Sequence, residues 1–124
     1  MGDPAKTVML IVEDEALIRW PLKLRLEEEG MKVIEAADGA SALSQIGHDG
    51  ISGVLLDLRL PDMNGLEILR ELRKHHPDCH VWIMTAYGTP ETRDEAEQLG
   101  VEEFIDKPFD VDGLVQKLLQ RLGD

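Results

Sequence analysis

Uninterrupted apolar runs alternate along the chain with segments in which apolar residues recur every three or four positions. Three runs, at residues 8–12, 53–56 and 81–84, are built mainly from aliphatic residues. Runs of this length are typical of strands that are buried on both faces of a parallel sheet. Two shorter runs, at 33–34 and 104–105, are flanked by charged residues. We expect these two strands to lie nearer the edges of the sheet.

Residues that commonly cap helices precede four of the five amphipathic segments. They are Asp38, Asn64, Thr89 and Asp110. Asn64 is followed three positions later by Glu67, which is the spacing of a capping box, and Pro90 follows Thr89 at the first helical position. The sequence therefore predicts one helix that begins near residue 17 and four more that begin after these caps.

The predicted helices differ in how much apolar surface they carry. The last helix has a continuous apolar stripe formed by Val111, Leu114, Val115, Leu118, Leu119 and Leu122. The first helix has Trp20 and Leu24 at helical spacing, and Pro21 in its interior removes a backbone donor and is expected to kink the axis. The fourth helix has chiefly Ala96 and Leu99, so we expect it to be weakly anchored to the core.

Strand and helix alternate five times, which predicts an α/β fold of the (βα)5 type. Right-handed crossovers place helices on both faces of a parallel sheet. We therefore expect a flavodoxin-like three-layer sandwich with strand order 2-1-3-4-5. The 124 residues fit one domain spanning residues 1–124, which is either a complete protein or a piece of a longer one.

The composition disfavours several classes of protein. A formal net charge of −12 opposes direct binding to nucleic acid and favours cations and basic partner surfaces. The single cysteine, Cys79, excludes an internal disulfide, and no apolar run approaches the length of a membrane span. We therefore expect a cytoplasmic protein that binds neither DNA nor membrane directly.

Polar residues stand where four of the predicted strands end. Glu13 and Asp14 follow the first strand, Asp57 the third, Thr85 the fourth and Lys107 the fifth. The carboxyl ends of parallel strands meet at one edge of the sheet, where open α/β folds bind ligands. We therefore expect three carboxylates, one hydroxyl and one ammonium group to share a single pocket.

Carboxylates that lie close together repel one another, so either one of them takes up a proton or a cation binds between them. A set of hard oxygen ligands suits Mg²⁺. We expect Asp14 and Asp57 to coordinate Mg²⁺ directly and Glu13 to act through a bound water. A backbone carbonyl just after Asp57, that of Arg59, is expected to complete the protein ligands.

Such a pocket also suits the transfer of a phosphoryl group. A carboxylate can attack phosphorus, and Asp57 is expected to be the nucleophile because its predicted strand points it into the pocket. Lys107 and Thr85 would each hold a phosphoryl oxygen. Each residue alone has an ordinary explanation as a cap, turn or solvated charge. Their occurrence together at four strand ends favours the functional interpretation.

Two other groups of residues have structural explanations that we prefer. A soft-metal site would use residues that fall within six positions, namely His75, His76, Cys79 and His80. These residues span a predicted helix end, turn and strand start, so their side chains should point in different directions. Trp20 and Trp82 are expected to pack in the core or between helix and sheet and not to bind a ligand.

Over essentially its whole length the chain resembles the receiver domain of bacterial two-component response regulators. The segments that carry the resemblance are residues 11–15, 56–65, 84–88 and 104–109. The resemblance implies that Asp57 accepts a phosphoryl group from a phosphohistidine on a sensor histidine kinase or phosphotransfer protein. It implies that Glu13 and Asp14 hold Mg²⁺ and that Thr85 and Lys107 contact the phosphoryl group. It also implies a cis peptide bond before Pro108.

The same resemblance implies a switch. Thr85 would move toward the phosphoryl group, and the ring of Phe104 would turn inward into the space that Thr85 leaves. The surface formed by the fourth helix, fifth strand and fifth helix would then shift and act on an output domain or effector protein, with homodimerisation as a further possibility. Arg59 and Tyr87 would flank the path of the water that removes the phosphoryl group.

Two other functions are compatible with the sequence. One is a phosphohydrolase with an aspartyl-phosphate intermediate. Such enzymes usually carry a second Asp two residues after the nucleophile, where this chain has Arg59. The other is a docking module, with or without a flavin, that needs no phosphorylation. The residues Asp57, Thr85 and Lys107 argue against it, since that module would not require them.

Overall fold

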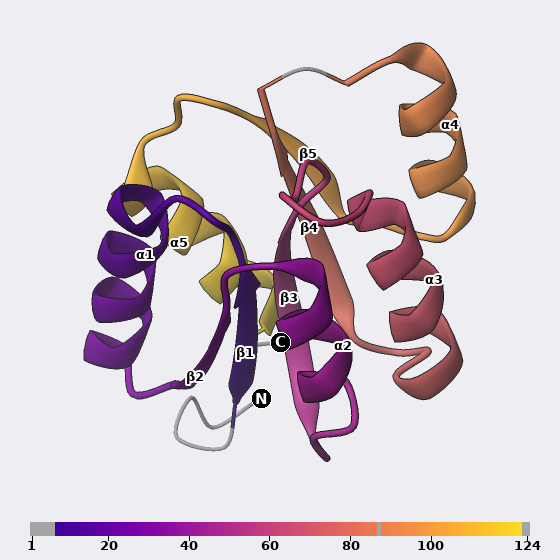
Figure 1. The fold of residues 1–124 in the computed structure, drawn as a ribbon. Helices are drawn as coiled ribbons and strands as arrows, with labels where there is room; N and C mark the ends of the chain where they lie inside the picture. The colour runs from indigo at the N-terminus through magenta and orange to yellow at the C-terminus, as the bar shows by residue number, and fades with distance from the viewer. Residues whose placement is uncertain (1–6, 87, 123–124) are drawn as a thin grey trace.

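A computed structural model describes residues 7–86 and 88–122. Five parallel strands form one sheet in the order β2-β1-β3-β4-β5, with helices between them (Figure 1). The elements are β1 (Val8–Val12), α1 (Ala16–Glu28), β2 (Lys32–Ala36), α2 (Gly39–Gln45), β3 (Ile51–Asp57), α3 (Gly65–His75), β4 (His80–Thr85), α4 (Pro90–Gln98), β5 (Glu103–Asp106) and α5 (Val111–Leu122). The predicted fold and strand order are confirmed, and β2 and β5 lie at the edges as expected.

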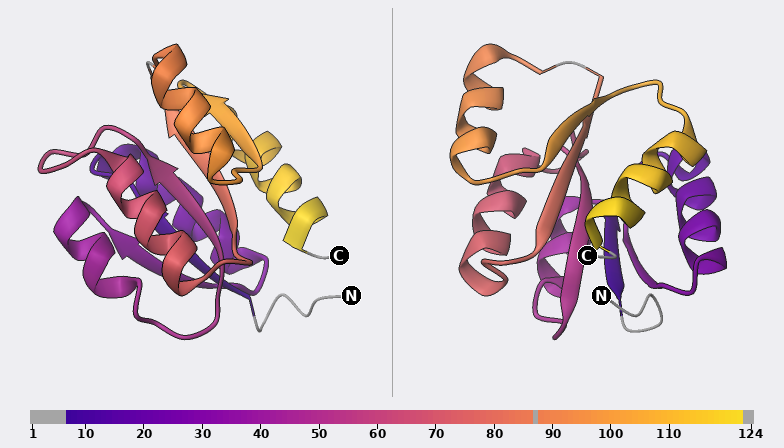
Figure 2. Two further views of the ribbon diagram at one scale, coloured as in Figure 1. Left: turned by 90° about the vertical axis from the view of Figure 1, so that its right-hand side faces the viewer. Right: turned by 180° about the vertical axis from the view of Figure 1, so that it is seen from behind.

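Two hydrophobic cores lie on opposite faces of the sheet. Helices α1 and α5 cover one face, and α2, α3 and α4 cover the other (Figures 1 and 2). Successive residues of β1 alternate between these cores, so that Met9 and Ile11 face α1 and α5 while Leu10 and Val12 face the other layer. All four are fully buried, which explains why a strand in the middle of the sheet has no polar position.

The buried face of α1 differs from the face that the sequence suggested. Leu22 and Leu26 are fully buried, whereas Trp20 is 53% exposed and Leu24 is 60% exposed. The prediction that Trp20 packs in the core is therefore wrong, while the same prediction for Trp82 is confirmed. Both faces of this helix carry apolar residues at helical spacing, and only one of the two faces packs on the sheet.

Pro21 lies on the exposed side of α1, and the helix continues through it. Because proline has no N–H, the backbone carbonyl four residues earlier lacks its usual helical donor. That carbonyl belongs to Leu17, which is itself 84% exposed. Water can therefore satisfy the carbonyl, which limits the cost of the proline.

The predicted helix caps and the predicted anchoring of α4 and α5 are confirmed. Asp38 accepts a hydrogen bond from Ser41 N at 2.7 Å, and Asp110 accepts one from Gly113 N at 2.8 Å. The apolar stripe of α5 packs into one core, whereas α4 has Ala96 as its one fully buried residue. None of the described helices is long and apolar enough to cross a bilayer.

Candidate functional site

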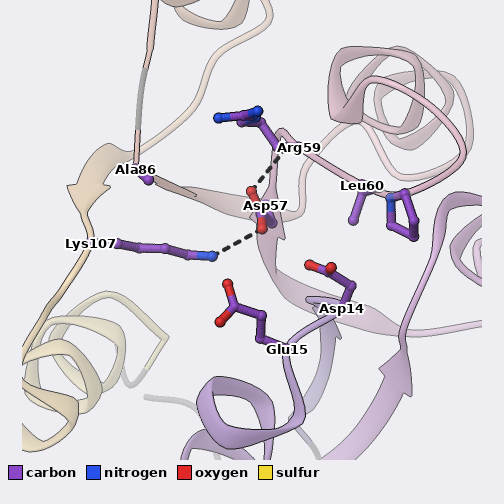
Figure 3. A pocket seen from close by; sticks show the side chains of 8 residues that line it. Asp14, Glu15, Asp57, Arg59, Leu60, Ala86 and Lys107 are labelled. Atoms are coloured by element: carbon purple, nitrogen blue, oxygen red, sulfur yellow. Dashed lines mark hydrogen bonds and ion pairs between the residues drawn. The ribbon is translucent and has the colours of Figure 1, made fainter.

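A pocket of about 310 Å³ opens at the carboxyl edge of the sheet, between the loops that follow β1, β3, β4 and β5 (Figure 3). Its lining residues are Asp14, Glu15, Asp57, Arg59, Leu60, Pro61, Ala86 and Lys107. Carboxylate oxygens of Glu13, Asp14 and Asp57 lie within 4.8 Å of one another. The structure therefore brings together the three acidic residues and the lysine that the sequence placed at separate strand ends.

Asp57 is the last residue of β3, and its side chain is held from two sides. Its Oδ1 accepts a hydrogen bond from the backbone N–H of Arg59 at 2.9 Å, and its Oδ2 accepts one from Lys107 Nζ at 2.9 Å (Figure 3). The residue is 4% exposed. The carboxylate is thus fixed in orientation at the floor of the pocket, with an ammonium group against one of its two oxygens.

Lys107 also contacts Glu13, which is fully buried. Lys107 Nζ lies 2.6 Å from Glu13 Oε1, and Glu13 Oε2 accepts a hydrogen bond from Glu15 N at 3.0 Å. At 2.6 Å the Lys107 ammonium group is the charged partner of this buried oxygen, although the contact lacks the alignment of a regular hydrogen bond. Glu13 is therefore held inside the pocket from two sides, by an ammonium group and by a backbone N–H.

Burial and charge shift the acidity of the residues around this ammonium group. Burial raises the pKa of Glu13, and the neighbouring charge of Asp57 raises it further, although Lys107 and the N–H of Glu15 oppose this. Burial alone would lower the pKa of Lys107, but its bonds and charges with Glu13 and Asp57 outweigh burial and raise it. Lys107 therefore stays protonated, and a single ammonium group faces two carboxylates.

These residues fit a divalent cation. The three clustered carboxylates carry more negative charge than Lys107 neutralises, since its one ammonium group is shared between Glu13 and Asp57. Asp14 is exposed, and its carboxylate points toward Asp57 in the pocket (Figure 3). Buried Glu13 and exposed Asp14 therefore lie on the inner and outer sides of one set of oxygen ligands.

The predicted switch residues lie on β4 and β5, two of the strands whose following loops border this pocket. Thr85 is the last residue of β4 and is fully buried, and its carbonyl accepts a hydrogen bond from Lys107 N at 2.9 Å. Phe104 lies on β5, half-buried against the core under α4. The Lys107–Pro108 peptide bond is cis, as the resemblance implied. Tyr87 is outside the described residues.

The loop that joins β3 to α3 closes tightly above Asp57. Gly65 N donates to the carbonyl of Leu58 at 2.8 Å, and a Cβ on Gly65 would lie 2.5 Å from the carbonyl oxygen of Asp57 and 2.7 Å from Cα of Leu58. Backbone cannot move away as a flexible side chain can. The absence of a side chain at Gly65 therefore allows α3 to begin directly against the strand end that carries Asp57.

We predict that Gly65→Ala destabilises the protein and displaces Asp57. The new methyl group meets backbone atoms, and overpacking of this kind typically costs about 1–3 kcal/mol. Denaturant unfolding should show this loss. Gly47→Ala is the matched control, because a Cβ there meets no atom within 4 Å. Equal stabilities of the two variants would contradict the prediction.

Several residues around the site were not predicted to lie there. Leu60, Pro61 and Ala86 line the pocket only because their loops fold over it. Arg93, on α4, places its guanidinium 4.7 Å from the centre of the Phe104 ring. The spacing of Arg93 and Phe104 along the chain follows neither a helical nor a strand period, so only the packing of α4 beside β5 brings them together.

The histidine and cysteine cluster does not form a metal site. His76 Nε2 lies 2.6 Å from the carbonyl oxygen of Ile46, and His80 Nδ1 lies 2.6 Å from Glu102 Oε1, so the two rings have separate partners. Cys79 is buried, and burial raises its thiol pKa. Among residues 7–86 and 88–122, the one cluster suited to a metal ion is that of Glu13, Asp14 and Asp57.

Comparisons with curated proteins identify relatives of the chain. It is similar to the probable transcriptional regulatory protein TcrX of Mycobacterium tuberculosis, with 32% identity over 98% of this chain and 53% of that protein. It is also similar to sporulation initiation phosphotransferase F of Bacillus subtilis, with 38% identity over 84% of each. The chain thus spans about half the length of TcrX and most of the length of the phosphotransferase.

Comparisons with solved structures agree. A CheY-like receiver domain protein from Methanospirillum hungatei JF-1 superposes with a TM-score of 0.88 and 31% identity, covering 94% of both chains. A CheX–CheY–BeF3–Mg complex from Borrelia burgdorferi gives a TM-score of 0.80 and 26% identity, covering 93% of this chain and 88% of that one. A family model described as the response regulator receiver domain matches residues 9–119. The chain therefore belongs to the response regulator receiver domain family.

Proposed function

We propose that this receiver domain is a switch that accepts a phosphoryl group on Asp57 from a phosphohistidine of a partner kinase or phosphotransfer protein. The observation that carries the proposal is the position of Lys107 Nζ, 2.6 Å from Glu13 and 2.9 Å from Asp57, in a pocket with three clustered carboxylates. Because the ammonium group already lies beside Asp57, it can neutralise the negative charge of an incoming phosphoryl group.

In the proposed reaction one carboxylate oxygen of Asp57 attacks phosphorus. The new O–P bond forms as the N–P bond to the donor imidazole breaks, and the imidazole keeps the electron pair of that bond. Lys107 neutralises an oxygen of the transferred group, and Thr85 donates its hydroxyl to another. Because these groups mainly position and neutralise charge, the domain is a signalling component with intrinsic self-phosphorylation and dephosphorylation, and not a turnover enzyme.

Mg²⁺ is the proposed cofactor. Asp14 and Asp57 would hold it directly, Glu13 through a water, and Arg59 by its backbone carbonyl. The excess of carboxylates over the single ammonium group supports this ligand set. The ion would supply positive charge that screens the incoming phosphoryl group. The magnesium named in the Borrelia complex supports the same choice by family analogy.

Intact mass of the protein before and after incubation with acetyl phosphate and Mg²⁺ tests the proposed function. We expect the wild type to gain the mass of one phosphoryl group, and the gain should disappear when Mg²⁺ is chelated. A protein that stays unmodified under these conditions would refute the assignment. Repeated hydrolysis of ordinary phosphate esters would instead indicate a phosphohydrolase.

We predict that Mg²⁺ binding strengthens as the pH rises through the pKa of Glu13. This pKa is raised above the ordinary value of 4.5, so the folded protein favours the protonated side chain. Without metal, the stability due to that protonation is present at low pH and is lost as the pH rises through the folded pKa. Mg²⁺ competes with the proton, so its affinity should increase over the same interval.

Calorimetric titration with Mg²⁺ at several pH values checks this prediction. Glu13→Gln is the matched control, since it keeps the side chain's length and removes its titration. The difference in Mg²⁺ affinity between wild type and variant should widen with increasing pH. A constant difference from acid to neutral pH would show that Glu13 does not govern metal binding.

The proposed readout is a shift of the surface formed by α4, β5 and α5, with the Phe104 ring turning inward. The structure supports Arg93 as a part of this switch. Its guanidinium lies over the Phe104 ring, and one guanidinium nitrogen lies 3.2 Å from Asp106 Oδ1. Its side chain also fills the space beside Gly88, since a Cβ added to Gly88 would lie 3.0 Å from Arg93 Nε. Inward rotation of Phe104 would break this stacking.

We predict that Arg93→Ala increases the population of the inward ring about two- to fivefold, because stacking at such a site is worth about 0.5–1 kcal/mol. Fluorine NMR of protein labelled with fluorophenylalanine measures this, with Phe109 as the internal reference. Arg70→Ala is the control, because it removes an ion pair between α3 and Glu95, and Glu95 lies on α4 as Arg93 does. An unchanged Phe104 signal in the Arg93 variant would rule out the role of Arg93.

The remaining features follow from the family. We propose that residues 1–124 form a single receiver domain in a cytoplasmic signalling pathway. Its proposed partners are a sensor histidine kinase or phosphotransfer protein, an output domain or effector protein, and a second copy of the chain in a phosphorylation-dependent homodimer. The formal net charge of −12 supports the view that any DNA binding belongs to an output domain.

A further inference from the structure

The loop at residues 58–64 connects the phosphoryl acceptor to α3 and carries three residues of the pocket, Arg59, Leu60 and Pro61. Its base is closed by the hydrogen bond from Gly65 N to Leu58 O at 2.8 Å and by an antiparallel bridge between Arg59 and Asn64. These contacts hold the two ends of the loop. They do not determine where its outer part, residues 60–63, lies.

Asp62 attaches the outer part of this loop to α2. Its Oδ1 accepts a hydrogen bond from Gly39 N at 2.7 Å, and its Oδ2 accepts one from Ala40 N at 3.0 Å. Both N–H groups are in the first turn of α2, where backbone donors have no acceptor within the helix. The bond from Gly39 is the main reason why the pKa of Asp62 is lowered, so the side chain is a charged acceptor for both donors.

Met63 adds an apolar contact at the same place. Its side chain lies directly over Gly39, so closely that a Cβ on Gly39 would overlap the thioether. Gly39 is itself buried in the first turn of α2. The loop is therefore attached to α2 by two adjacent residues, Asp62 through hydrogen bonds and Met63 through packing.

We infer that Asp62 is a positioning residue for metal binding. By attaching the outer part of the loop to α2, it would restrain the segment next to Arg59, and so the direction of the Arg59 backbone carbonyl, beyond the restraint that the Arg59–Asn64 bridge gives. Asp62 does not line the pocket, and both of its carboxylate oxygens are bonded to α2. It would therefore act on Mg²⁺ only through the loop, and this inference rests on the proposed metal site.

Asp38 offers a matched control within the same structure. It caps the same helix by accepting a hydrogen bond from Ser41 N at 2.7 Å. Both Asp38 and Asp62 thus stabilise the first turn of α2, but the Asp38 bond stays within residues 38–41 and does not span the gap to the loop. Loss of either carboxylate should weaken α2, and only loss of Asp62 should release the loop.

The experiment compares wild type, Asp62→Ala, Asp62→Asn and Asp38→Ala by calorimetric titration with Mg²⁺ alone and by hydrogen exchange without metal. Loss of a group that orients a metal ligand typically weakens affinity by a factor of about ten or more. We expect Asp62→Ala to lose about tenfold in Mg²⁺ affinity and Asp62→Asn to lose less, because an amide keeps one acceptor. Asp38→Ala should bind Mg²⁺ as the wild type does.

Hydrogen exchange gives a readout that is independent of metal. The Arg59 N–H, which donates to Asp57 Oδ1, and the other amides of residues 58–64 should exchange faster in Asp62→Ala than in Asp38→Ala. Equal Mg²⁺ affinity in Asp62→Ala and wild type would overturn the inference, as would equal losses in the Asp62 and Asp38 variants. If the wild type itself does not bind Mg²⁺, the proposed metal site is wrong as well. A wild type that binds Mg²⁺ as tightly as Asp62→Ala does would overturn only the role of Asp62.

Discussion

Asp57→Asn should abolish the uptake of a phosphoryl group from acetyl phosphate in the presence of Mg²⁺. The amide keeps the size of the side chain and can still accept the hydrogen bond from Arg59 N, but it has no second carboxylate oxygen to attack phosphorus. Intact mass should show the added phosphoryl group on the wild type and none on the variant. The modification of the wild type should be lost in alkali, as expected for an acyl phosphate.

The control for this prediction is Asp49→Asn. Asp49 is an exposed aspartate in the turn before β3, at the opposite end of the strand from Asp57. This variant should be modified to the same extent as the wild type. Stoichiometric labelling of Asp57→Asn would show that another side chain receives the phosphoryl group. Peptide mapping of the labelled protein would then identify that side chain.

Lys107→Met should destabilise the protein without metal and should be partly rescued by Mg²⁺. Methionine keeps the apolar stem but leaves Glu13 and Asp57 without their shared ammonium group. Removing one partner of a buried ion pair costs about 3–5 kcal/mol. We expect about 2–3 kcal/mol here, because Glu13 can take up a proton and the pocket opens to solvent.

Denaturant unfolding with and without Mg²⁺ measures this effect. Lys117→Met is the control, since Lys117 pairs with Glu103 at 2.7 Å on the surface, where both side chains are about half exposed. Surface pairs of this kind contribute about 0–1 kcal/mol, so this variant should behave almost like the wild type. If the two lysine variants lose the same stability, or if Mg²⁺ does not restore any of it, the charge balance proposed for the site is wrong.

The elements of the fold that the sequence predicted well are those in which local pattern and tertiary environment agree. The strands β1, β3 and β4 are buried on both faces, so their apolar runs left little choice of structure. The stripe of α5 was also predicted correctly, since its opposite face is polar. In α1, by contrast, the apolar residues Leu17, Trp20 and Leu24 are on the exposed face while Leu22 and Leu26 face the sheet.

The candidate site was predictable for the same kind of reason. Each of its charged residues lies at the end of a strand or within two residues after it, and parallel strands end at one edge of the sheet. The contacts that connect these residues were not predictable. The bridge that Lys107 makes between Glu13 and Asp57, and the bonds of Asp62 to α2, join segments that are far apart along the chain.

By itself, then, the amino-acid sequence determined the order of strands and helices, the parallel sheet and the acidic residues at its carboxyl edge. These depend on periodicity and on strand ends, which are local properties. The tertiary structure alone decided which face of α1 is buried, which two carboxylates share the Lys107 ammonium group, which loop reaches α2, and which side chain lies over Phe104. Those features depend on the distance between side chains of separate elements, which no period along the chain records.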